Sequence, residues 1–91
     1  MANIKSAKKR IRQTVARTLR NKIRKTMVKT AVRRFESALN QKDFESAELA
    51  LRFCYARLDR AAQKGSIHRN AAARKKSRLT ERLNKSKSES A

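Results

Sequence analysis

The fold is decided by the stretch KGSIHRNAAARKKSRL, residues 64–79, which holds the only glycine and the only histidine of this 91-residue chain. Because the sequence has no proline, little else in it interrupts a helix. Gly65 suits the left-handed position at which helices commonly end, and Ser66 suits the cap of a following helix. We therefore predict a tight helix-to-helix turn here, with a new helix over residues 67–84.

This last helix has two different faces. At 100° per residue, Ala72, Leu79 and Leu83 share one face, whereas Arg74, Arg78 and Arg82 share another. The first face is predicted to pack and the second to present a row of cations. Residues 85–91 are polar and low in complexity, which predicts a frayed tail.

Two further helices are expected before the turn. Apolar residues recur every three or four positions from Ile4 to Leu39, which predicts a helix over residues 4–39, about 54 Å long. Up to Ile23 there is about one apolar residue per turn, and from Met27 the apolar stripe widens. The second half of this helix is expected to dock on a core, while the first half depends mainly on a partner for its order.

A middle helix is predicted over residues 44–64, capped by Asp43. It is apolar on more than one side, which suits the central element of a bundle. The aromatic side chains are expected to pack in the core rather than stack on bases; they are Phe35, Phe44, Phe53 and Tyr55. The predicted fold is a single all-α domain over residues 1–91, a three-helix bundle with a long, protruding N-terminal helix.

The charge of the chain is strongly positive and unevenly placed. There are 26 lysine and arginine residues against 7 acidic residues, a formal charge of +19. Residues 1–35 hold 13 of the cations and no acid, residues 36–60 are close to neutral, and residues 61–91 are basic again. So small a chain has a marginal core, which self-repulsion weakens further. We expect a polyanionic partner, with nucleic acid ahead of an anionic membrane.

Several other classes of protein find little support. The single Cys54 excludes an internal disulfide and a zinc finger, and it fits a small buried hydrophobe. No paired carboxylates and no glycine-rich phosphate loop occur, so we expect no enzyme, no cofactor and no metal. No apolar run reaches the length of a membrane span and no secretory signal is visible, which indicates a soluble intracellular protein.

The basic segments are candidates for phosphate contact, because lysine and arginine displace condensed counterions and the arginine fork matches phosphate oxygens. The alternative is a merely solvated helix face, but residues 1–35 lack the acids that would form stabilising pairs on it. Neutral residues such as Asn3, Gln13 and Asn70 could add hydrogen bonds to RNA or be ordinary surface residues. His68 could touch RNA or simply begin a helix.

Three blocks resemble a known family in the same order. They are MANIKSAKKRIRQ at residues 1–13, RNKIRKTMVKT at residues 20–30, and DRAAQKGSIHRNAAARKKSRLTERLNK at residues 59–85. Together they resemble bacterial small-subunit ribosomal protein number twenty, over nearly the whole chain. Residues 36–57 match mainly in pattern, and Ala71 stands where many members of the family carry a lysine.

The resemblance implies direct binding to small-subunit ribosomal RNA early in assembly, with contacts to its 5′ domain and its long penultimate helix. It also implies a cytoplasmic protein of the small subunit with few protein contacts, no membrane and no small-molecule substrate. The RNA target comes only from the resemblance. The candidate RNA-binding residues selected by charge and resemblance are Asn3, Lys5, Ser6, Lys8, Lys9, Arg10, Arg12, Gln13, Arg17, Arg20, Asn21, Lys22, Arg24, Lys25, Lys29, His68, Arg69, Asn70, Arg74, Lys75, Lys76, Ser77, Arg78 and Arg82.

Two rival functions remain open at this point. An architectural DNA-binding protein would share the charge and the small size, although such proteins often use apolar wedges or minor-groove arms. A membrane-surface helix over residues 4–23 would need a broader apolar face with aromatic residues, and none occurs before Phe35. An organellar targeting peptide is a further alternative for the basic N-terminus.

Overall fold

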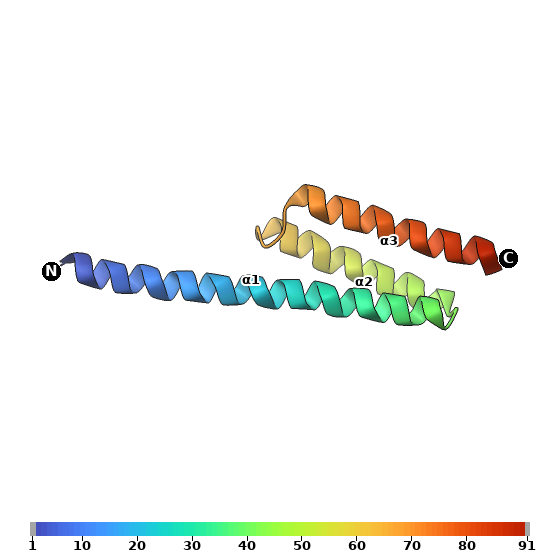
Figure 1. Cartoon of the computed structure of the whole chain (residues 1–91), viewed down its shortest axis with the longest axis horizontal. Helices are drawn as coiled ribbons and strands as arrows, with labels where there is room; N and C mark the ends of the chain where they lie inside the picture. Colours follow the sequence, from blue (N-terminus) through green and yellow to red (C-terminus); the bar gives the residue numbers. More distant parts are fainter. Residues whose placement is uncertain (1, 91) are drawn as a thin grey trace.

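The computed structural model describes the backbone of residues 2–90 and the side chains of residues 4–90. Three helices follow one another, α1 (Ala2–Asn40), α2 (Phe44–Gln63) and α3 (Arg69–Ser90), and no strand occurs in this range (Figure 1). The molecule measures 70 by 22 by 13 Å, because α1 extends far beyond the other two helices (Figure 1). The predicted all-α fold with a long first helix is confirmed.

The core lies where the second half of α1 packs against α2 and α3. Phe35, Cys54, Leu58 and Leu79 are its largest fully buried side chains, and they come from all three helices. Burial in apolar surroundings raises the pKa of the Cys54 thiol, as expected for a cysteine that acts as a small hydrophobe. Since α2 lies between α1 and α3, it must be apolar on two sides (Figure 1).

The turn between α1 and α2 agrees with the sequence. Asp43 caps α2, because its Oδ1 accepts a hydrogen bond of 3.2 Å from the backbone N–H of Ser46. The Ser46 hydroxyl also donates to Oδ2 of Asp43 over 2.7 Å. These two bonds hold the pKa of the Asp43 carboxyl below its usual range.

The second turn has the predicted position but a different cap. Gly65 adopts a φ of 76°, the left-handed conformation predicted for it. However, α3 begins at Arg69 rather than near Ile67, and its first turn is capped by His68 rather than Ser66. The backbone N–H of Asn70 donates to Nδ1 of His68 over 3.1 Å. Ser66 does not cap α3 because it lies three residues before Arg69, and its hydroxyl donates a hydrogen bond to α1.

Two further sequence predictions are wrong. The tail expected to fray at residues 85–91 is helical as far as Ser90, where the described part ends, and an ion pair between Lys87 and Glu48 ties it to α2. On α2, Phe53 was expected in the core, but 46% of its surface is exposed, and Leu49 of the same helix is 62% exposed. With only two neighbouring helices, α2 cannot cover every apolar side chain it carries.

Candidate nucleic-acid interface

The N-terminal part of α1, residues 2–20, projects away from the bundle and is called the arm (Figure 1). Every described side chain from Ile4 to Arg20 is exposed. The charged side chains of the arm are all cations: Lys5, Lys8, Lys9, Arg10, Arg12, Arg17 and Arg20. The side chain of Asn3, also a predicted RNA contact, lies outside the described residues. The arm thus offers a one-sign electrostatic surface of the kind that follows a phosphate backbone.

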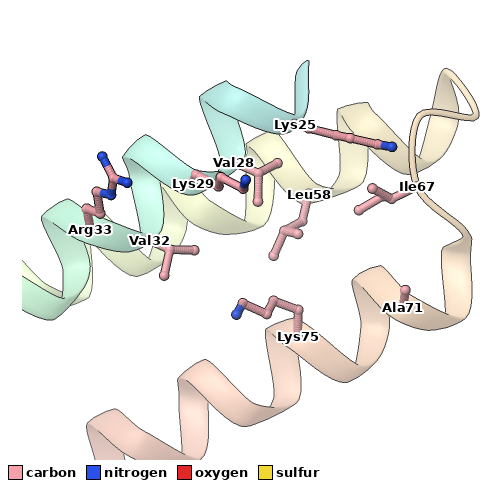
Figure 2. A pocket seen from close by; sticks show the side chains of 9 residues that line it. All are labelled: Lys25, Val28, Lys29, Val32, Arg33, Leu58, Ile67, Ala71 and Lys75. Atoms are coloured by element: carbon pink, nitrogen blue, oxygen red, sulfur yellow. The ribbon is translucent and has the colours of Figure 1, made fainter. Parts of the chain in front are cut away.

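A groove runs between α1 and α3, with α2 as its floor (Figure 2). Its volume is about 440 Å³. Val28 and Val32 line it from α1, Leu58 from α2 and Ile67 from the turn (Figure 2). Ala71 of α3 completes the apolar lining, and a lysine at this position would reduce the space. We call this feature the α1–α3 groove.

The charged side chains that line the α1–α3 groove are all cations among the described residues. Lys25, Lys29 and Arg33 stand on α1 at intervals of four residues, and Lys75 extends from α3 (Figure 2). Lys25, Lys29 and Lys75 were selected from the sequence, and Arg33 was missed. The interval of four, which places residues on one helical face, was the signal that could have found it. The geometry brings cations from two helices to one anion-attracting surface.

Three ion pairs hold α3 against the rest of the bundle. Lys76 contacts Asp59 of α2 over 2.8 Å, and Arg82 contacts Glu36 of α1 over 2.9 Å. The hydrogen bond and the charge of Lys87 hold the pKa of Glu48 below its usual range. Lys76 and Arg82, both predicted RNA contacts, are therefore partly neutralised within the chain. Such exposed pairs orient a helix more than they stabilise it.

A small polar cluster joins the second turn to α1. The hydroxyl of Ser66 donates to Oδ1 of Asn21 over 2.8 Å. Nη1 of Arg24 lies 3.3 Å from the same Oδ1 and 3.4 Å from the Ser66 oxygen. Asn21 and Arg24, two predicted RNA contacts, thus also fix the start of α3 relative to the arm.

The remaining candidates on α3 lie at its exposed surface. His68, Arg69, Asn70, Arg74, Ser77 and Arg78 are all exposed. His68 uses Nδ1 for the helix cap, which leaves Nε2 as the ring nitrogen available to a ligand. These exposed candidates belong to α3 and the turn before it, whereas the arm belongs to α1.

Residues 2–90 lack two other kinds of feature, metal-binding groups and membrane-spanning helices. They contain no group of three or more histidine, cysteine, aspartate or glutamate side chains that could hold a metal ion. None of their helices is long and apolar enough to cross a membrane.

Comparison with known proteins decides the family. The model of the family described as "Ribosomal protein S20" matches residues 2–84. The chain belongs to the ribosomal protein S20 family. Proteins called "Small ribosomal subunit protein bS20" are similar over nearly their full length. The relative from Desulforamulus reducens is 59% identical over 85 residues, which cover 93% of this chain and 97% of the relative.

Further members of the S20 family agree. The bS20 protein of Natranaerobius thermophilus is 57% identical over 84 residues, covering 92% of this chain and 96% of the relative. The bS20 protein of Clostridium beijerinckii is 50% identical over 84 residues, which cover 92% of this chain and 97% of the relative. The resemblance found in three sequence blocks is confirmed. The expectation that the protein is not an enzyme is also confirmed, because the relatives are ribosomal proteins.

Proposed function

We propose that this chain binds small-subunit ribosomal RNA directly and stabilises the folding of that RNA during assembly. The observation that carries the proposal is the series of 13 lysine and arginine residues, with no acid among them, over residues 1–35. The arm has cations and no acid, and Lys25, Lys29 and Arg33 extend this acid-free stretch of α1 as far as the α1–α3 groove. A run of one sign over such a length matches a phosphate backbone and little else in a cell.

The arm and the exposed cationic face of α3 act as the two sides of a clamp. The Ser66–Asn21 bond and the ion pairs of α3 hold the cationic face of α3 at a fixed offset from the arm. Each surface takes a separate RNA segment, and holding both restricts the RNA to folded arrangements. The family resemblance suggests the 5′ domain and the long penultimate helix as these segments. The names of the bS20 relatives support a place in the small ribosomal subunit, in the cytoplasm. The family resemblance further suggests few protein contacts.

The test is a salt titration of binding to three nucleic acids: the isolated 5′ domain of small-subunit ribosomal RNA, an unrelated structured RNA, and duplex DNA. We expect a preference for the ribosomal RNA that persists as salt rises, because shape recognition adds to counterion release. Equal affinities that fall steeply together would contradict the proposal and favour an architectural DNA-binding protein.

Two charge variants sharpen this test. The arm variant Arg10→Gln, Arg12→Gln, Arg17→Gln should lower the salt slope by about one unit for each phosphate that the arm no longer neutralises. The matched control is Arg52→Gln, which removes an exposed cation of α2 that lines neither the arm nor the α1–α3 groove. It should leave the slope unchanged. Equal decreases in the slope per charge removed, in the arm variant and in the control, would mean that only net charge matters.

A further inference from the structure

An apolar patch lies on the side of the α1–α2 pair where Ile23, Met27 and Phe53 meet, and we call it the Phe53 patch. The exposed fractions are 45% for Ile23, 42% for Met27 and 46% for Phe53. Phe53 stands on α2 and the other two on α1, so the patch spans two helices. A phenyl ring left half in water on so small a domain is an unfavourable arrangement unless a partner covers it.

An arginine already lies over the ring. The guanidinium carbon of Arg57 is 4.9 Å from the ring centroid of Phe53, within the range of a cation–π contact. Nη1 of the same guanidinium is 3.5 Å from Sδ of Met27. Arg57 therefore covers one side of the Phe53 ring and reaches from α2 to Met27 of α1. An aromatic ring paired with a planar guanidinium is a typical platform for an unpaired nucleobase.

The surroundings of the Phe53 patch are cationic. Two hollows of about 480 and 250 Å³ adjoin it, and Ile23, Met27, Phe53 and Arg57 line both. The charged side chains that line these hollows in the described part of the chain are arginines only: Arg20, Arg24, Arg34, Arg57 and Arg60. Arginine forks bind phosphate oxygens in a bidentate manner. The patch thus combines an apolar platform with groups that would hold the phosphates next to a stacked base.

We propose that the Phe53 patch is a stacking site for an unpaired base of the RNA that this chain binds. The proposal rests on the proposed RNA-binding function and adds a contact surface on α2, which the charge pattern of the sequence did not select. A paired base in a duplex cannot reach the ring, so the ligand is a nucleotide in a loop, bulge or end. A second copy of the chain is a poor occupant, because it would bring two rings of arginines together at a formal charge of +19 per chain.

The experiment compares Phe53→Leu with Phe53→Trp for binding to complete small-subunit ribosomal RNA. Leucine keeps an apolar side chain on Met27 and Ile23 but removes the ring, and tryptophan keeps an aromatic face. We expect Phe53→Leu to raise Kd about tenfold with an unchanged salt slope, since no cation is removed. Phe53→Trp should bind at least as well as the wild type. The control is Leu49→Ala, which removes a comparably exposed apolar side chain of the same helix and should leave Kd unchanged.

Phe53→Trp also supplies a direct readout, because the chain has no tryptophan of its own. Stacking on a base should quench the indole fluorescence and shield it from acrylamide when RNA is added. Wild-type Kd for Phe53→Leu, together with an indole that stays accessible in the complex, would overturn the stacking site. If the arm variant still weakens binding in that case, the proposed function stands without it. If the wild-type chain shows no preference for ribosomal RNA, the proposed function fails and the stacking site fails with it.

Discussion

The hydroxyl of Ser66, in the turn between α2 and α3, donates a hydrogen bond of 2.8 Å to Oδ1 of Asn21, 45 residues earlier on α1. Only 8% of Ser66 is exposed, so this bond is shielded from water on most sides. It connects the start of α3 with the base of the arm. The geometry of the clamp therefore depends on a contact between two small polar side chains.

Replacing Ser66 by alanine should lower the free energy of unfolding by about 1 kcal/mol, because Asn21 and Arg24 lose a partner in a partly buried position. Urea unfolding followed by circular dichroism measures this. Ser37→Ala, at an exposed serine of α1, is the control and should show no loss. A Ser66→Ala protein as stable as the wild type would mean that water replaces the hydroxyl at no cost.

Replacing Gly65 by alanine should destabilise the protein by about 1–2 kcal/mol through backbone strain alone. The φ of Gly65 is 76°, and no atom lies within 4 Å of the position that a Cβ would occupy. Steric collision therefore plays no part. Gly65→Asn is the matched variant, because asparagine tolerates the left-handed region better. Thermal unfolding should rank the wild type above Gly65→Asn, and Gly65→Asn above Gly65→Ala; the reverse order of the two variants would contradict the strain argument.

Replacing Phe35 by alanine should cost about 3–5 kcal/mol, since the side chain is fully buried at the centre of the core. In a domain of this size such a loss is expected to unfold the bundle. Far-ultraviolet circular dichroism would show the loss of helix. Leu49→Ala removes an apolar side chain that is 62% exposed and should change stability little. Similar losses in the two variants would mean that the core lies elsewhere.

The cap of α2 should make stability depend on pH below about pH 4. The pKa of Asp43 is lowered in the folded state by its bonds to Ser46. A carboxyl with a lowered folded pKa contributes stability that is present above its unfolded pKa and is lost as the pH falls through the folded value. Asp43→Asn keeps a capping side chain that does not titrate. The Tm of the wild type should fall relative to that of Asp43→Asn as the pH is lowered from about 6 to about 2.5. A difference in Tm that stays constant with pH would contradict the assignment.

Local chemistry is what the sequence predicted well. Gly65 and Asp43 act through their own backbone and through neighbours within three residues, so their roles can be deduced without the fold. The exposure of the arm follows in the same way from one apolar residue per turn. The positive charge of the arm can also be deduced from the sequence without knowledge of the fold.

Features that depend on distant residues could not be predicted. Ser66 lies three residues before the start of α3 and bonds to Asn21, far away in sequence, instead of capping that helix. Residues 85–90 stay helical beside Glu48, which their own composition does not suggest. The α1–α3 groove requires the spacing of two helices, and Phe53 is left exposed because α2 has only two neighbours. The apolar residues of α2 lie on more than one side of the helix, and nothing in their pattern distinguishes the buried side from the exposed side.

The clamp is tested most directly by hydroxyl-radical footprinting of small-subunit ribosomal RNA with three proteins. They are the wild type, the arm variant Arg10→Gln, Arg12→Gln, Arg17→Gln, and the α3 variant Arg69→Gln, Arg74→Gln, Arg78→Gln, which changes exposed cations of α3. The clamp predicts that the wild type protects two separate RNA segments, and that each variant loses protection of one segment while keeping the other. Protection of a single segment, or loss of the same segments in both variants, would contradict it.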